Sequence, residues 1–276
     1  MTDSLPYAEV IGDPISHSKS PLIHNYWLNA LGIEAEYRKT HVTREGLAAY
    51  FLDRRADPDW LGCNVTIPHK VAVMDYVTDP SDIRGRIGAM NTIACETGGP
   101  LIGTNTDAGG FLQPLEALGW RGREAVLIGA GGAALAIGFA LAAKGMEHVI
   151  IMARDAAKGQ ALLDHAGLQG RVIGFADPLP ATRLLINSSP LGMTGQPPLD
   201  LDLAPLAEDA TVYDIVYAPL ETSLLRAARD RGLATIDGLA MLIGQAALAF
   251  EIFFDALPPR EDDDAELRAL LTAPAL

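Results

Sequence analysis

Residues 124–134 read EAVLIGAGGAA, and this stretch decides the fold class of the 276-residue chain. The apolar run Glu124 to Ile128 is typical of a buried strand, and the small residues after it indicate the start of a helix. In this GxGxxA turn Gly129 allows the tight bend, Gly131 lets a pyrophosphate approach the backbone and Ala134 permits close helix–strand packing. The helix start then offers free N–H groups and a positive dipole end to the phosphates. The stretch therefore predicts a dinucleotide-binding α/β domain rather than a glycine-lined packing contact.

The end of the next expected strand, His148 to Met152, separates the two nicotinamide cofactors. An acidic residue at such a strand end binds the ribose 2′-hydroxyl of NAD, whereas an arginine accepts the 2′-phosphate of NADP. Here Arg154 directly follows Ala153, and Lys158 lies one helical turn further on. This arrangement predicts NADP. Asp155 is expected to cap the following helix, and it would weaken the NADP preference only if it faced the ribose instead.

A second chemical centre is predicted at residues 62–70, which read GCNVTIPHK. Asn64 and Thr66 alternate with apolar residues and so share one face of a strand end. Pro68 suits the first position of a helix that would carry Lys70. Two neutral hydrogen-bonding groups and one cation suit a small polyhydroxylated ligand with a reacting oxygen. The alternative is a solvated lysine, but the chain has only five lysines against sixteen arginines, so lysine is not its routine surface cation.

A carboxylate follows another expected strand, in the segment Thr104-Asn105-Thr106-Asp107. A lysine and a carboxylate in one cleft can shuttle a proton near neutral pH. Lys70 and Asp107 are therefore candidates for a proton-transfer pair, although spacing alone leaves open whether they meet.

Four more polar residues are candidates for ligand binding. Ser18 and Ser20 lie two apart just after the strand expected at Tyr7 to Ile11, so both can face a ligand; the alternative for Ser20 is a helix N-cap. Tyr217 at another strand end is either a ligand contact or a half-buried core residue. Gln245 is polar within an apolar helix, and its buried amide needs a backbone or ligand partner.

Composition excludes several function classes. A net charge of −14 argues against nucleic acid and against anionic membranes as partners. Cys63 and Cys95 have no metal or disulfide spacing, and an N-terminus without a basic, apolar leader points to the cytoplasm. Ala125 to Ala143 is uncharged, but a buried strand, turn and helix explain it better than a membrane span. We expect Glu261 to Asp264 to be a solvated helix start rather than a metal site.

Alternating strands and helices extend along the whole chain. Helices are expected at 21–31, 45–55, 80–86, 107–118, 132–144, 220–231 and 237–254, strands at 35–42, 171–174, 183–187 and 211–215, and a hairpin turn at 97–99.

Seven segments, in this order, resemble the shikimate dehydrogenase family, and the resemblance runs from about Val10 to Phe254. They are GDPISHSKSPLIHN (12–25), NVTIPHK (64–70), GAMNT (88–92), NTD (105–107), GAGGA (129–133), NSSPLGM (187–193) and DGLAMLIGQ (237–245). The resemblance implies an α/β enzyme of two domains with an active-site cleft between them. Residues 1–107 and 238–276 would form the substrate-binding and catalytic domain, and residues 108–237 a doubly wound, Rossmann-type NADP-binding domain.

The resemblance also implies an oxidoreductase acting on a CH–OH group, which reversibly reduces 3-dehydroshikimate to shikimate with NADPH in the chorismate pathway of aromatic amino acid biosynthesis. Lys70 would donate and accept the proton, with Asp107 as its partner. The substrate would contact Ser18, Ser20, Asn64, Thr66, Asn91, Asp107, Tyr217 and Gln245. The cofactor would contact Gly129, Ala130, Gly131, Gly132, Ala133, Ala134, Ala153, Arg154, Lys158, Ile215 and Gly238. No metal is expected, and the enzyme would be a cytoplasmic monomer or homodimer.

This chain departs from the family pattern at two places. This chain has Ala153-Arg154-Asp155 at the position where NADP-selective members carry a run that resembles Asn-Arg-Thr. Ala240 stands where a glycine is usual near the nicotinamide. Ser20 matches shikimate-preferring members, whereas quinate-preferring relatives tend to carry threonine. The alternatives are a quinate/shikimate dehydrogenase that uses NAD, and a non-catalytic NADP-binding regulator; the presence of both Lys70 and Asp107 argues against the regulator.

Overall fold

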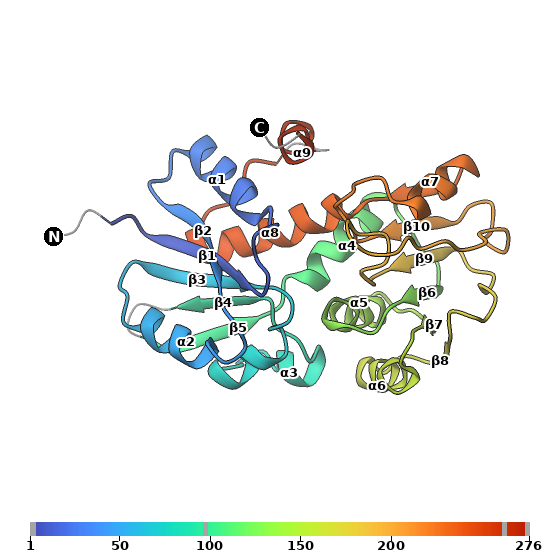
Figure 1. Ribbon diagram of the computed structural model, residues 1–276, viewed down its shortest axis with the longest axis horizontal. Helices are drawn as coiled ribbons and strands as arrows, with labels where there is room; N and C mark the ends of the chain where they lie inside the picture. Colours follow the sequence, from blue (N-terminus) through green and yellow to red (C-terminus); the bar gives the residue numbers. More distant parts are fainter. Residues whose placement is uncertain (1–3, 96–98, 261–263, 274–276) are drawn as a thin grey trace. The chain divides into compact units, whose positions relative to one another are not determined.

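The computed structural model describes residues 4–95, 99–260 and 264–273. The chain divides into two compact units, Met1–Thr106 with Gln245–Leu276, and Asp107–Gly244 (Figure 1). Each unit has its own sheet and its own covering helices. The α/β class predicted from the alternating pattern is confirmed.

The first unit contains a five-stranded sheet in the order β2-β1-β3-β4-β5. Its strands are β1 (Tyr7–Gly12), β2 (Glu36–His41), β3 (Trp60–Val65), β4 (Thr92–Cys95) and β5 (Leu101–Thr104). Its helices are α1 (Ser20–Leu31), α2 (Leu47–Arg55), the 3-10 helix η1 (Ala72–Tyr76), α3 (Ile83–Arg86), the second half of α8 (Gly238–Phe254) and α9 (Ala265–Thr272). β1 pairs in parallel with β2 and β3, whereas β4 is antiparallel to β3 and β5.

The core of the first unit lies where α1 and the second half of α8 pack on the sheet. All six residues of β1 are buried, as expected for a central strand covered on both faces. His24 on α1 stacks on the ring of Tyr37, with ring centroids 3.9 Å apart, and Trp27 and Phe250 pack around it. Within the described part of the chain neither ring nitrogen of His24 has a hydrogen-bond partner, and burial lowers the pKa of His24 to about 3. His24 is therefore a neutral, apolar-packed core residue.

The second unit contains a parallel sheet of six strands in the order β11-β10-β9-β6-β7-β8. Its strands are β6 (Glu124–Ile128), β7 (His148–Met152), β8 (Gly170–Ile173), β9 (Leu184–Asn187), β10 (Thr211–Asp214) and β11 (Ala234–Ile236). Its helices are α4 (Asp107–Ala117), α5 (Gly132–Ala143), α6 (Ala156–Ala166), α7 (Ser223–Asp230) and the first half of α8. Counted from β6, this is the 3-2-1-4-5-6 order of doubly wound folds, in which ligands bind at the carboxyl ends of the strands where the order reverses, here between β6 and β9.

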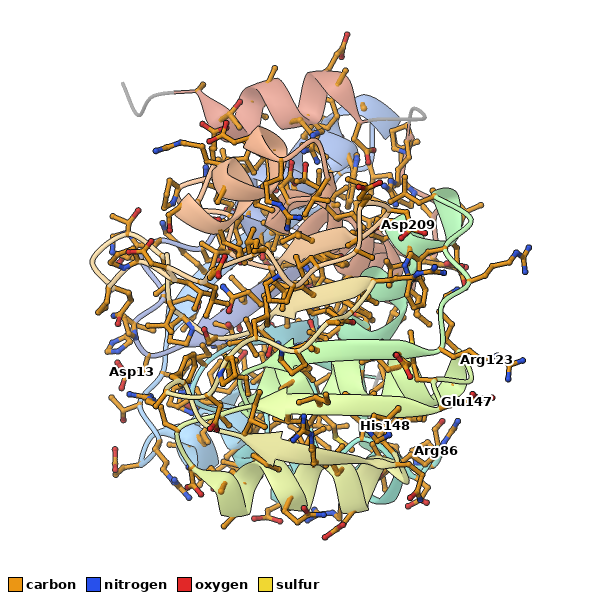
Figure 2. All side chains as sticks on the ribbon, turned by 90° about the vertical axis from the view of Figure 1, so that its right-hand side faces the viewer. Asp13, Arg86, Arg123, Glu147, His148 and Asp209 are labelled. Carbon is orange, nitrogen blue, oxygen red and sulfur yellow. The ribbon has the colours of Figure 1, made fainter. Side chains whose placement is uncertain are left out.

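The opposite edge of the second sheet carries charged residues at the amino ends of its strands. Figure 2 shows Arg123, Glu147 and His148 together at the start of β6 and β7, with Asp209 just ahead of β10. Arg123 and Glu147 form an ion pair there. Asp209 lies 3.4 Å from Arg183, and the glycine turn lies at the other end of β6.

Most expected elements agree with the structure within a few residues, but the helix expected after Pro68 is wrong. Lys70 lies in a turn, and only a short 3-10 helix, η1, begins two residues later. The physical reason is that the carbonyl of Lys70 accepts a hydrogen bond from Met90 N at 2.8 Å, so it is not used in a helix. The helix expected at 80–86 is confirmed only for the four residues of α3.

The tail of the chain contains a helix, α9, directly after the segment Glu261 to Asp264 that was expected to be a helix start; Asp264 is buried rather than solvated. Asp264 directly precedes it and pairs with Arg260, while Glu261 to Asp263 and the centre of the expected hairpin turn at 97–99 lie outside the described residues. Among the residues that the structure describes, no helix is long and apolar enough to cross a membrane. No group of three or more histidine, cysteine or acidic side chains in that part of the chain is placed to hold a metal ion.

Candidate functional site

The end of β3 and the turn after it hold Lys70 by its main chain. Thr66 N donates to Ile11 O at 2.9 Å, which ties the turn to β1. The buried His69 ring donates from Nε2 to Val42 O at 2.6 Å, which ties the turn to the loop after β2. Together with the bond from Met90 N, these contacts fix the backbone on both sides of Lys70 and leave its side chain as the part that can reach a ligand.

Asn64 sits in a buried network that the sequence did not indicate. Tyr37 Oη donates to Asn64 Oδ1 at 2.5 Å, while Asn64 Nδ2 donates to Asn91 O at 3.2 Å and to Thr92 Oγ1 at 3.0 Å. Both N–H groups of the Asn64 amide are therefore engaged. A ligand can meet Asn64 only at the remaining lone pair of its oxygen.

Asn91 continues this network toward the segment that precedes Asp107. Asn91 Oδ1 accepts from Thr106 N at 2.7 Å, and Asn91 Nδ2 donates to Thr106 Oγ1 at 2.9 Å and to Gln245 Oε1 at 3.4 Å. The amide of Gln245 thus has the protein partner that a buried amide needs. Asp107 follows Thr106 directly, begins α4 and is buried, so its main chain starts from a segment that two Asn91 bonds hold.

Ser18 and Ser20 lie at the N-terminus of α1. The amide of Ser20 donates to Ser18 Oγ at 3.3 Å, and Ser20 is the first residue of the helix, so Lys19 rather than Ser20 holds the N-cap position. Within the described part of the chain, the Ser20 hydroxyl makes no hydrogen bond of its own. Two hydroxyl groups beside a helix N-terminus suit an anionic ligand such as a carboxylate.

The glycine turn of the second unit has the space and the donors that a pyrophosphate needs. Gly129 has φ +102°, and a Cβ placed on it would lie 2.9 Å from Ser188 Oγ, so only glycine fits there. A Cβ placed on Gly131 would meet nothing within 4 Å, which leaves open space in front of α5. No side chain caps α5, so its first N–H groups remain available to phosphate oxygens. The structure therefore fits the predicted dinucleotide.

Positively charged side chains follow β7, at the position where the 2′-phosphate of NADP would bind. Arg154 is exposed and has no ion pair within the described residues. Asp155 is the N-cap of α6 and accepts from Lys158 N at 3.1 Å, which confirms the capping role expected for it. One oxygen of this carboxylate is therefore engaged at the helix start. Lys158 is exposed and lies 4.0 Å from the Asp155 carboxylate.

A buried carboxylate, Asp214, organises the strand ends on the other side of the glycine turn. It accepts hydrogen bonds from Asn187 Nδ2 at 2.9 Å, Val216 N at 3.1 Å and Thr222 Oγ1 at 2.7 Å. Burial raises the pKa of Asp214, and these three donors partly offset that rise. Ile215 follows directly, and its amide donates to Asn187 O at 3.0 Å.

Tyr217 and Gly238 complete this side of the second unit. Tyr217 is half-buried, and burial raises the pKa of its phenol. Gly238 starts α8 so close to the strand end that a Cβ there would lie 2.4 Å from Ile215 O. Ile215 and Gly238, both expected beside the cofactor, therefore lie next to each other just after β10.

The structure brings the expected residues together in groups within each unit. In the first unit Asn64, Asn91 and Gln245 share one hydrogen-bonded network; in the second, the glycine turn and Ile215 lie at the carboxyl edge of one sheet. Sequence reasoning missed Tyr37 and Asp214, which hold these groups in place. A signal for Tyr37 existed in the sequence, because it is the one hydrophobic side chain in the otherwise polar strand β2.

Comparison with known proteins identifies the family. A model of the shikimate dehydrogenase substrate binding domain matches residues 10–93, and a model of the shikimate 5′-dehydrogenase C-terminal domain matches residues 238–268. A protein of Sphingopyxis alaskensis named shikimate dehydrogenase (NADP(+)) is 62% identical over 97% of both chains. The chain belongs to the shikimate dehydrogenase family. The predicted family is thereby confirmed.

Solved structures agree with this membership of the shikimate dehydrogenase family. Shikimate 5-dehydrogenase from Thermus thermophilus, in complex with NADP(H) and shikimate, has a TM-score of 0.83 and 33% identity and covers 97% of this chain and 98% of its own. A ligand-free 5-ketofructose reductase of Gluconobacter has a TM-score of 0.88 and 29% identity, with 98% of both chains covered. The predicted two-domain α/β class is confirmed, while the fold alone is shared by enzymes named for different substrates.

Proposed function

We propose that this chain is an NADP-dependent shikimate dehydrogenase, which reversibly reduces 3-dehydroshikimate to shikimate in aromatic amino acid biosynthesis. The observation that carries the proposal is the near full-length match to the Sphingopyxis enzyme named for this activity. The local geometry of both units agrees with it, since one unit offers a phosphate-binding turn and the other a set of neutral hydrogen-bonding groups around a lysine. We assign the enzyme to the cytoplasm, as a monomer or homodimer.

In this proposal the second unit, residues 108–237 in the predicted division, holds NADP. The pyrophosphate binds at the turn from Gly129 to Ala134, where α5 presents uncapped N–H groups. Arg154 and Lys158 bind the 2′-phosphate, because a guanidinium and an ammonium are the groups that form strong charge-assisted bonds to phosphate oxygens. Ala153, Ile215 and Gly238 line the remainder of the cofactor.

The remaining residues, 1–107 and 238–276, supply all of the proposed substrate contacts except Tyr217. At the start of α1, the hydroxyl groups of Ser18 and Ser20 donate hydrogen bonds to the carboxylate of the substrate. Its ring hydroxyls bind the other assigned side chains, which are Asn64, Thr66, Asn91, Asp107, Tyr217 and Gln245. The buried hydrogen bonds that join Asn64, Asn91 and Gln245 hold these three amides in place before the substrate arrives, and such pre-organisation lowers the entropic cost of reaching the reactive geometry.

Lys70 is the proposed proton donor in the reductive direction, with Asp107 as its partner. NADPH supplies the hydride when it is bound. The ketone oxygen of 3-dehydroshikimate then develops negative charge, and the Lys70 ammonium stabilises this charge and transfers its proton to that oxygen. In the oxidative direction Lys70 accepts the hydroxyl proton of shikimate. The backbone contacts that hold the turn from Thr66 to Lys70 fix the main chain from which this side chain extends.

A four-way rate comparison tests the proposed activity. The oxidation rates of shikimate and quinate are measured, each with NADP and with NAD, at equal substrate concentrations. We expect the shikimate and NADP pair to give the highest kcat/KM, because Arg154 has no competing ion pair among the described residues and Asp155 is engaged in capping α6. A faster rate for quinate with NAD would identify a quinate/shikimate dehydrogenase instead. Absence of turnover despite shikimate binding would identify a cofactor-binding regulator.

A further inference from the structure

The C-terminal helix α9 packs on the helix that begins at the substrate serines. Figure 1 shows α9 beside α1, both in the first unit, and the two helices contact each other. Leu267 and Leu271 of α9 are 2% and 1% exposed, whereas Leu270 on another face of the same helix is 42% exposed. The helix therefore has one buried apolar face, which indicates that it packs on the first unit.

Polar contacts join the same two helices. The ammonium of Lys19 donates to the carbonyl of Leu271, near the C-terminal end of α9. Tyr26 Oη on α1 donates to Glu266 Oε2 at 2.9 Å, near the start of α9. Two polar contacts at opposite ends of α9, together with the leucine face, specify both its position and its direction along α1.

The contact of Lys19 is one that a helix end favours. The last carbonyl groups of a helix have no partner within the helix, and the helix dipole places partial negative charge there. A half-buried ammonium at that position satisfies one of these carbonyls and gains from the dipole. The ammonium of Lys19 is thereby turned toward α9.

Lys19 lies between the two serines that were assigned above to the substrate carboxylate. It occupies the N-cap position of α1, where Ser18 Oγ accepts from the amide of Ser20 at 3.3 Å. Building on that assignment, we propose that docked α9 positions Ser18 and Ser20 for the substrate carboxylate, with Lys19 as the positioning residue that transmits the restraint. Lys19 acts through the serines in this account and does not touch the substrate.

Two full-length variants test this role from both helices. Lys19→Met removes the donor, and Leu267→Asp places a carboxylate on the buried face of α9 and undocks it. We expect each to raise the KM for shikimate about fivefold, while kcat and the KM for NADP stay within about twofold, since only the carboxylate end of the substrate site is loosened. Lys19→Arg, which keeps a cation, is expected to retain most of the affinity. Leu270→Asp, at an exposed position of the same helix, is the matched control and should leave the KM unchanged.

The double variant Lys19→Met with Leu267→Asp distinguishes this positioning role from the alternatives, in which Lys19 acts independently of α9 or α9 is only structural. Because both changes break one connection, the double variant is expected to raise the KM no further than either change alone. Full multiplication of the two effects would show that Lys19 acts on the substrate independently of α9 and would overturn the proposal. A lowered melting temperature with an unchanged KM would also overturn it, because α9 would then be only structural. If Leu267→Asp does not fold, an unchanged KM in Lys19→Met overturns the proposal by itself. A wild-type chain that does not turn over shikimate would instead contradict the proposed function.

Discussion

His24 is a buried histidine whose ring nitrogens have no hydrogen-bond partner among the described residues. Burial lowers its pKa to about 3 in the folded chain, compared with about 6.5 for an unperturbed histidine. Below pH 6.5 the unfolded chain therefore binds a proton that the folded chain does not, so the free energy of unfolding falls as the pH is lowered from about 6.5 toward 3. His24 thus destabilises the fold in acid.

Replacement of His24 by phenylalanine removes this acid sensitivity and keeps the ring stacking on Tyr37. The free energy of unfolding of the wild type, measured by urea titration, is expected to fall between pH 7 and pH 5 by about 2 kcal/mol more than that of His24→Phe. Equal pH dependence in wild type and His24→Phe would show that His24 titrates normally in the fold.

Single residues were predictable where their role depends on close neighbours in the chain. The capping role of Asp155 and the tight bend at Gly129 were both readable from adjacent residues, and the structure shows both. The bond from Tyr37 to Asn64 joins residues 27 positions apart, and the bond from Lys19 to Leu271 joins residues 252 apart. Such contacts depend on how the elements pack, so no local pattern indicates them.

The junction of β7 and α6 is the element that decides between the two cofactors. Its only acidic residue, Asp155, caps α6, and Arg154 beside it is an exposed cation. Arg154→Ala is expected to raise the KM for NADP by about tenfold or more, because charge-assisted bonds to the 2′-phosphate are lost, and to change the KM for NAD by less than about twofold. Steady-state kinetics with both cofactors measure this. Equal increases for NADP and NAD would remove Arg154 from 2′-phosphate recognition.

Elements with strong local patterns were predicted well, and those set by distant contacts were not. The strand at Glu124–Ile128 and the strand at His148–Met152 agree with the structure to the residue, because continuous apolar runs next to glycine or charged residues mark them. The turn that carries Lys70 was expected to be helical. Its actual conformation depends on the bond from Met90, which lies 20 positions further along the chain and cannot be read from the local pattern.

At the scale of the whole molecule, the alternation of polar and apolar residues did not predict the order of the strands in the two sheets. β1 pairs with β3, and β6 pairs with β9, although about 50 to 60 residues separate the paired strands along the chain. Periodicity predicts that a strand exists but does not say which strand lies beside it. The resemblance to a known family, carried by seven short segments, supplied the expectation of two domains that periodicity alone could not.

The central claim of the account is that Lys70 in the first unit transfers the proton, while residues of the second unit hold the cofactor. The most direct test is the steady-state kinetics of Lys70→Ala in the reduction of 3-dehydroshikimate with NADPH. We predict that kcat falls by a factor on the order of 100 or more, as for the loss of a general acid, while the KM values for both substrates change only a few-fold. An unchanged kcat in Lys70→Ala would contradict the claim.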